Sequence, residues 1–259
     1  MREKTKSLVL ILSCCIAVLW PFTAQAGTIS FSDDPSLYGN LNQHLVSQIG
    51  EKGCGPTSEV NALMFLQNQY PGTYGTKLVP GGDLVSAALN MAADMNTAPD
   101  GTSLSDFISG LEKYVNNAAP GTTMYSPEKF KNDPDTWMLW VYQELSSGDA
   151  LEALMVKLPS GEGHNHFITV YGVSWNSDSE TGTLSFVDPY TGLTATDDVV
   201  YEDGALYLDY FRDGKPSTSS LYGALAEGPA GTPTATPEPC TLMLLGSFLG
   251  LGGLLRRRK

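Results

Sequence analysis

Cysteine and histidine are scarce in this 259-residue chain, which has four cysteines and three histidines. Three of the cysteines, Cys14, Cys15 and Cys240, lie in apolar stretches near the two ends, so Cys54 stands alone in the body of the sequence. A lone cysteine excludes a disulfide within that body. One cysteine and three histidines do not make the spacing of a zinc site, and no calcium-loop pattern or glycine-rich phosphate loop occurs. We therefore expect no metal ion and no cofactor.

Basic residues are also few, since 15 Lys and Arg stand against 28 Asp and Glu. Seven of the basic residues but only two of the acidic ones lie in the two end segments. The body between residues 27 and 236 thus carries eight basic and 26 acidic side chains, a formal charge of −18. So acidic a body argues against binding to nucleic acid or to an anionic membrane surface. It suits a soluble exported protein with a weak preference for basic substrates.

The first 26 residues are typical of a secretory signal peptide. A short basic region precedes the apolar residues 8–19, and Ala24-Gln25-Ala26 suits cleavage by signal peptidase. A lipoprotein signal ending at Cys14 would leave too short an apolar region. The N-terminus therefore predicts export, with the mature chain beginning at Gly27.

The C-terminal residues 237–259 have a distinctive order. Pro237-Glu238-Pro239 precedes sixteen mostly apolar residues, 240–255, and the chain then ends in four basic residues. This order resembles the PEP-CTERM sorting signal of Gram-negative bacteria. The resemblance implies that the tail holds the protein in the inner membrane until an exosortase removes it, so that the protein reaches the cell surface or extracellular matrix. An ordinary tail anchor remains the alternative, although sixteen residues fall short of the ~20 that a spanning helix needs. Positive-inside reasoning puts the body of the chain in the periplasm.

The pattern along residues 27–216 predicts one domain in which helices come first and strands second, which is an α+β fold. Residues 217–236 are rich in Pro, Gly, Thr and Ala, and predict a flexible stalk. Residues 27–47 read as largely irregular. We expect helices over 54–69, over 81–95, from a cap at Thr102 or Ser103, and from a cap at Asp135. We expect strands over 150–158, 166–175, 183–187, 194–201 and 205–211.

Cys54 is the candidate nucleophile. It lies in Gly53-Cys54-Gly55-Pro56 and opens the first predicted helix, where unpaired backbone N–H groups and the helix dipole favour a thiolate. A buried structural thiol is the alternative, since free cysteines are often buried. The backbone N–H of Cys54 itself would supply one donor to an oxyanion.

A thiolate nucleophile needs a base and a group that orients the base. His166 opens a predicted strand and is the candidate base, while His164 lies two residues earlier and remains an alternative. His44 has no supporting context. Asp188 ends the strand that follows a hairpin, so it can lie beside His166 on an adjacent antiparallel strand and orient the imidazole; it can instead open a turn. Asp178 is expected at the solvated hairpin tip.

A second oxyanion donor is expected upstream of the nucleophile. The side-chain amide of Gln48, six residues before Cys54, is the favoured candidate. Gln43, eleven residues before Cys54, is a weaker rival. A solvent-facing amide is the alternative interpretation of Gln48.

These motifs together resemble papain-like cysteine peptidases. Gln48 and Cys54-Gly55-Pro56-Thr57-Ser58, with His166 and Asp188-Pro189, resemble the bacteriocin-leader-peptidase-like branch, and the hairpin around His166 and Asp188 is similar to the streptococcal immunoglobulin-degrading cysteine peptidase. The resemblance implies a papain-like α+β fold, with the nucleophile helix of an N-terminal helical part packed on a C-terminal antiparallel sheet. It also implies hydrolysis of peptide bonds in a protein or peptide substrate. The matching stretches cover about a fifth of the chain and leave residues 72–149 unmatched, and Asp188 stands where papain has Asn.

The sequence leaves two other functions open. Many proteins with a PEP-CTERM signal are not enzymes, so a non-catalytic surface or biofilm-matrix protein with a papain-like body is one alternative. The other is a transglutaminase-like acyltransferase, since those enzymes use Cys, His and Asp in the same order. The sequence does not separate hydrolysis from acyl transfer, and it does not identify the substrate.

Overall fold

The computed structural model describes residues 27–156, 165–212 and 215–231. The predicted signal peptide, the PEP-CTERM segment and His164 lie outside these ranges, so the structure does not bear on them. Within the described ranges, none of the helices combines the length and the apolar composition that crossing a membrane requires.

Helices dominate the first part of the chain, as the sequence pattern predicts. Ser103 caps one of them by accepting a hydrogen bond from the Asp106 amide, and Asp133 caps another through the Thr136 amide, two residues before the expected cap at Asp135. The α-helices are α2 (Cys54–Gln69), α3 (Pro71–Tyr74), α4 (Leu84–Asp94), α5 (Leu104–Ala118) and α6 (Pro134–Ser147). In the described part of the chain, four short 3-10 helices accompany them: η1 (Pro35–Leu37), η2 (Gln43–Leu45), η3 (Gly50–Lys52) and η4 (Pro80–Gly82).

The strands are antiparallel throughout the described ranges. They are β1 (Thr28–Ser32), β2 (Thr123–Lys129), β3 (Ala150–Val156), β4 (His166–Asn176), β5 (Thr181–Asp188), β6 (Leu193–Glu202), β7 (Ala205–Arg212) and β8 (Lys215–Pro229). Strands β3 to β8 pair in the order β4-β3-β8-β7-β6-β5, and β5 pairs again with β4. These six strands therefore close into a barrel, with β1 added beside β4 and β2 beside β8.

The closed barrel corrects the expected fold class. A papain-like nucleophile helix packed on a C-terminal antiparallel sheet is the wrong description, because the sheet has no free edge between β4 and β5. The long strand β8 causes the closure: its first half pairs with β7 and its second half with β3. The expected stalk is also wrong as far as Pro229, since that stretch forms β8.

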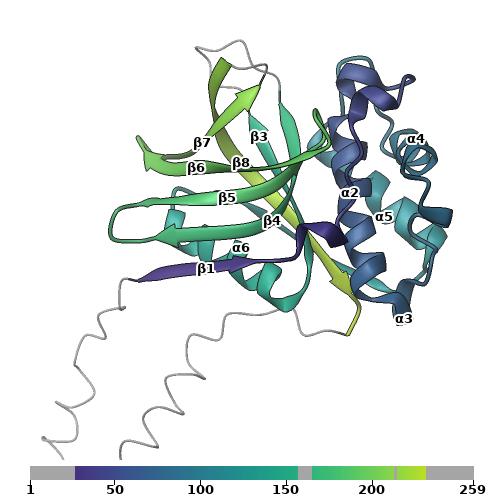
Figure 1. Ribbon diagram of the computed structural model, residues 1–259, viewed down its shortest axis with the longest axis horizontal. Helices are drawn as coiled ribbons and strands as arrows, with labels where there is room; N and C mark the ends of the chain where they lie inside the picture. The colour runs from purple at the N-terminus through teal and green to yellow at the C-terminus, as the bar shows by residue number, and fades with distance from the viewer. Residues whose placement is uncertain (1–26, 157–164, 213–214, 232–259) are drawn as a thin grey trace, which may run out of the picture.

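Strand β4 separates two apolar cores. Phe167 and Tyr171 pack with α2, α4 and α5, whereas Ile168 and Val170 point into the barrel interior, with which α6 also packs. Figure 1 shows α2 to α5 gathered on one side of the barrel. The barrel wall thus faces helices on one side and its own interior on the other.

Helix α2 lies between the barrel and helices α4 and α5, and most of its side chains are buried. A polar contact fixes it against β4. The Thr169 hydroxyl donates to the Ser58 carbonyl oxygen at 2.6 Å, and the two hydroxyl oxygens are 3.0 Å apart. Ser58 lies one helical turn after Cys54, and Thr169 lies three residues after His166, so this contact sets the position of the thiol relative to the imidazole.

Candidate active site

Cys54 is the first residue of α2 and is half-buried. Gly53 precedes the helix without a side-chain cap, which leaves first-turn N–H groups available. Pro56 fits in this turn because its missing N–H has no partner to lose. The amides of Gly55 and Phe167 donate hydrogen bonds to the thiol sulfur. The nucleophile candidate therefore lies where backbone donors favour negative charge.

His166 and Asp188 meet at the end of the barrel interior. They lie on neighbouring strands β4 and β5, and the His166 Nε2 is 2.8 Å from the Asp188 Oδ1, with both side chains buried. The Tyr190 amide donates to the same carboxylate oxygen at 2.9 Å. His166 also forms a hydrogen bond with the Cys54 thiol. The structure therefore brings together three of the four expected site residues.

Tyr210 is a further member of this group that the sequence interpretation missed. Its hydroxyl donates to the Asp188 Oδ2 at 2.7 Å and lies 3.2 Å from the His166 Nε2. Tyr210 lies in β7 on the same face as Leu206 and Leu208, which point into the barrel. The sequence signal that could have indicated Tyr210 is a hydroxyl-bearing side chain at an inward-facing position of a predicted strand. This signal does not identify the residue to which the hydroxyl binds.

Each of the three side chains has a pKa shifted toward its charged form. Burial raises the pKa of the Cys54 thiol, but the hydrogen bond and charge of His166 outweigh it, and the pKa is lowered. Burial acts downward on the pKa of His166, and its hydrogen bonds to Asp188 and Cys54 raise that pKa to about 9. Burial would also raise the pKa of Asp188, yet His166 and Tyr210 hold it below its usual value. The arrangement favours a thiolate, an imidazolium and a carboxylate.

The structure does not bring Gln48 to this site. Gln48 is exposed, and its side-chain oxygen accepts a hydrogen bond from the Ser47 hydroxyl. Gln43 is instead buried, and its Nε2 donates to the Glu51 carbonyl oxygen at 3.1 Å. The reason is the turn between η2 and η3, which carries Gln48 to the outside while the Gln43 backbone is held by the Pro189 carbonyl.

A cavity of about 610 Å³ opens over the thiol. Cys54, His166 and Gln43 line it together with residues of η3, of β4 and of the segment between α4 and α5. Its charged lining residues are Glu51, Asp100, Asp106 and Lys52. The thiol therefore lines a cavity whose charged lining residues are mainly acidic.

Two weaker candidates lie outside this cavity lining. His44 is at the surface, with its Nδ1 3.8 Å from the Glu51 carboxylate and its ring edge against Tyr190. Asp178 is exposed at the tip of the β4–β5 hairpin, as expected. Neither side chain lines the cavity with the thiol.

No protein-family model matches the chain, and no curated protein matches it in sequence. Among solved structures, the chain is similar to the active wild-type interpain A cysteine protease of Prevotella intermedia. The sequence identity is 13%, the TM-score is 0.44, and the match covers 76% of this chain and 98% of the interpain chain.

Proposed function

We propose that this protein is a cysteine-type peptidase that cleaves peptide bonds through Cys54, His166 and Asp188. The observation that carries the proposal is the buried contact between His166 and Asp188 at 2.8 Å, with the thiol hydrogen-bonded to the same imidazole. Asp188 and Tyr210 engage the Nε2, so the Nδ1 is left for the thiol. A thiolate prepared in this way is a nucleophile at neutral pH.

The reaction follows from these positions. The Cys54 sulfur attacks the carbonyl carbon of the substrate, and the carbonyl oxygen becomes an oxyanion. His166 donates its proton to the departing amine, which leaves an acyl group on the sulfur. His166, now neutral, takes a proton from water; the resulting hydroxide attacks the thioester and releases the acid. Asp188 and Tyr210 touch His166 and act by keeping its ring oriented.

We assign the oxyanion donors to the Cys54 backbone N–H and to the side chain of Gln43. One hydrogen of the Gln43 amide is used on the Glu51 carbonyl, and the second remains for the oxyanion. Gln43→Ala is expected to lower kcat by about 10²–10³-fold. Gln48→Ala is the matched control and should keep the activity. Loss of activity in the control alone would contradict the assignment.

The charge around the cavity supports a basic peptide as substrate. Glu51, Asp100 and Asp106 stand against the single Lys52 among the lining residues, and complementary charge mainly raises the rate of association. The preference for lysine or arginine peptides over glutamate peptides should therefore appear in kcat/KM and weaken with added salt.

The test of the proposed function compares the full chain with Cys54→Ala on a set of fluorogenic peptides and on denatured casein. Cleavage by the wild type, absent in the variant and blocked by an epoxysuccinyl inhibitor, supports the proposal. Incorporation of a labelled amine into a glutamine peptide, without cleavage, would instead identify an acyltransferase. Absence of both activities, with a Cys54 that alkylates no faster than a free thiol, leaves the non-catalytic surface protein as the better account.

We also propose that the chain is exported, held at the periplasmic side of the inner membrane and then sorted by an exosortase. The composition of the two ends supports this, because a signal-peptide pattern and a PEP-CTERM-like tail predict the same topology. Fractionation of cells with and without exosortase tests it: retention of the full-length chain in the cytoplasm would contradict the proposal.

A further inference from the structure

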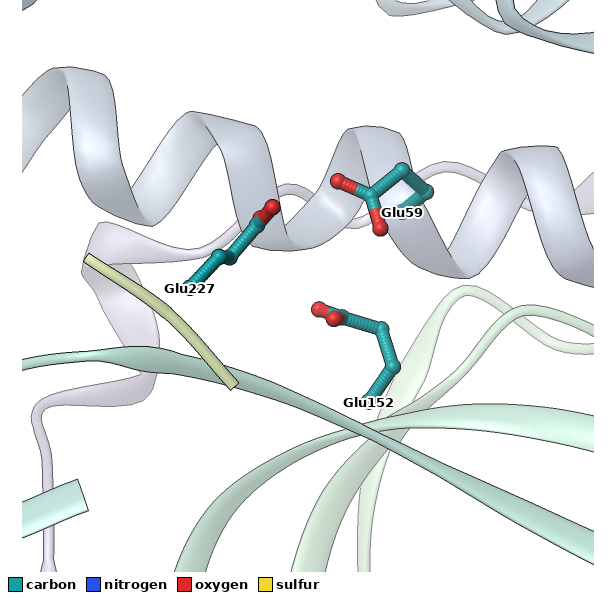
Figure 2. A group of neighbouring side chains, drawn as sticks. All are labelled: Glu59, Glu152 and Glu227. Atoms are coloured by element: carbon teal, nitrogen blue, oxygen red, sulfur yellow. The ribbon is translucent and has the colours of Figure 1, made fainter. Parts of the chain in front are cut away.

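Three glutamates meet where α2 packs against the barrel. Glu59 comes from α2, Glu152 from β3 and Glu227 from β8, and Figure 2 shows their carboxylates pointing toward one another between the helix and the strands. One oxygen of each lies within 4.8 Å of one oxygen of each of the others. The side chains are 0%, 1% and 1% exposed. Nothing in the proposed peptidase reaction uses this cluster.

The fold places these side chains together although they are far apart in sequence. Glu227 pairs with Ala150 across the β3–β8 ladder, two residues from Glu152, so both glutamates project from the same face of the barrel wall. The alternating neighbours Ala226 and Ala153 face the barrel interior instead. Glu59 lies five residues after Cys54, on the side of α2 that is turned to this wall.

When the three carboxylates are ionised, none of their six oxygens has a recorded hydrogen-bond donor in the described part of the chain. Among the described residues, none of the recorded ion pairs brings a lysine, arginine or histidine to them. A second unpartnered group lies nearby: the hydroxyl of Tyr125 is buried without a hydrogen bond, and Tyr125 is the register partner of Glu227 on β2. Buried carboxylates without partners are strongly unfavourable, so the cluster needs a positive charge or protons.

A proton shared between two of the three carboxyls does not give every buried polar group of the cluster a partner. The carboxyls of Glu59 and Glu227 approach each other closely enough to share a proton. Burial, and after it the charge of the neighbouring glutamates, raises the pKa of all three carboxyls, which shows that negative charge is unfavourable at this position without a proton or a cation. The shared proton leaves the carboxyl of Glu152 and the hydroxyl of Tyr125 without a partner. A cation at the centre of the cluster engages all three carboxylates at once.

We propose that Glu59, Glu152 and Glu227 form a calcium site that joins α2 to β3 and β8. Ca²⁺ takes six to eight oxygen ligands at about 2.3–2.6 Å, and three bidentate carboxylates supply six. Ligand oxygens on a common Ca²⁺ are then separated by about 2–5 Å, which includes the separation of up to 4.8 Å found here. Mg²⁺ fits less well, because it keeps several waters and demands a tighter octahedral shell.

The position of the site gives the ion a structural role. Helix α2 carries Cys54 at its first residue, and β3 pairs with β4, which carries His166. An ion bound to both sides fixes the helix against the barrel wall, five residues from the thiol. Its binding is a property of folding and ion content and does not depend on whether the protein is a peptidase.

The test uses the full chain stripped of ions with EDTA and dialysed at pH 7.5. Elemental analysis after exposure to Ca²⁺ and desalting is expected to find about one ion per chain. Thermal unfolding should show a Tm rise of about 5–10 °C at a Ca²⁺ concentration one hundred times the Kd. Mg²⁺ at the same concentration should raise the Tm much less. No bound ion and no Tm rise with Ca²⁺ would overturn the proposal, and so would a response to Mg²⁺ alone.

Substitutions separate the site from loose binding to the acidic surface. The triple variant Glu59→Gln, Glu152→Gln, Glu227→Gln keeps the shape and removes the charge, and it should lose both the bound ion and the Tm rise. Glu144→Gln is the matched control, since Glu144 is 3% exposed and also has an unpartnered oxygen; it should keep both. A triple variant that still binds one Ca²⁺ with the same Tm rise overturns the site. If the triple variant does not fold, the single variant Glu152→Gln is used to test the site. It should lower the affinity for Ca²⁺ at least tenfold, and an unchanged affinity for Ca²⁺ overturns the site.

Discussion

Replacing His166 by alanine is expected to return the Cys54 thiol to an ordinary ionisation. Two interactions with His166, a hydrogen bond and the attraction of its charge, are the largest causes that lower the pKa of this thiol. Without them, burial is opposed only by the amides of Phe167 and Gly55. The thiolate of the wild type should therefore form at a lower pH than the thiolate of the variant.

The size of the expected change in thiolate content follows from the pKa of an unperturbed thiol. A thiol with the unperturbed pKa of about 8.5 is ionised to only about 0.3% at pH 6. The thiolate absorbance near 240 nm is therefore expected to be close to zero at this pH in His166→Ala, and to rise at a lower pH in the wild type than in the variant. Thiolate absorbance is the better readout, because the rate of alkylation also falls as a thiolate becomes less basic, which partly offsets the change in its amount.

The experiment needs two reference proteins. Cys54→Ala gives the absorbance that does not come from the thiolate, since Cys54 is the one cysteine in the described ranges. His44→Ala removes a histidine that is exposed and does not line the cavity, and it should leave the titration unchanged. Equal midpoints for the wild type and His166→Ala would refute the reasoning, as would an equal shift in His44→Ala. Circular dichroism of each variant checks that the fold is kept.

Three further predictions concern the active-site group and the contact of Thr169 with α2. Tyr210→Phe should lower the free energy of unfolding by about 1–3 kcal/mol, measured by urea titration, because it leaves a buried carboxylate oxygen unpaired, whereas Tyr207→Phe, on the opposite face of β7, should have little effect. In the wild type, the lowered pKa of Cys54 adds stability as the pH rises toward the pKa of a free thiol, whereas the raised pKa of His166 removes stability as the pH rises above the pKa of a free imidazole. These opposing contributions overlap between about pH 6.5 and 8.5, so the free energy of unfolding should change by less than the ~1.4 kcal/mol per pH unit that either group would contribute alone, and thermal scans that show this full slope would contradict the pairing. Thr169→Val should cost about 1–3 kcal/mol, because the buried Ser58 hydroxyl loses its hydrogen-bond partner and the Ser58 carbonyl loses the donor at 2.6 Å that it has in addition to the helix amide; an unchanged urea midpoint contradicts this.

The local sequence predicted most individual elements because their signals are short-range. The apolar spacing and first-turn residues after Cys54 predicted the helix that the structure has as α2. The alternating or continuous apolar runs predicted β3 to β7 to within a few residues. Strand β8 was not predicted, because its Ser, Thr, Gly and Ala content is typical of a linker. It forms a strand through pairing with β7 and β3, and such pairing cannot be recognised within the segment itself. Missing this strand concealed the closure of the barrel.

The same division holds for the candidate site. Cys54, His166 and Asp188 were predicted as site residues from their residue types and from their positions at the ends of predicted helices and strands. Both kinds of information are local to each segment of the sequence. The choice between Gln43 and Gln48 depended on the direction of the turn between η2 and η3. This turn leaves the Gln43 side chain at the cavity and directs the Gln48 side chain to solvent. Tyr210 could not be predicted as a site residue because its hydrogen-bond partner, Asp188, lies on another strand.

The sequence by itself determined the candidate chemistry: a lone thiol at a helix start, an imidazole at a strand start and a carboxylate at a strand end. These are local properties, set by backbone propensity and by the apolar pattern on each segment. Only the tertiary structure decided that the strands close into a barrel, that a buried tyrosine holds the carboxylate, and that Glu59, Glu152 and Glu227 share one buried space. The physical reason is that each of these features depends on contacts between segments far apart in the chain, and strand register and closure are not encoded in any one of those segments alone.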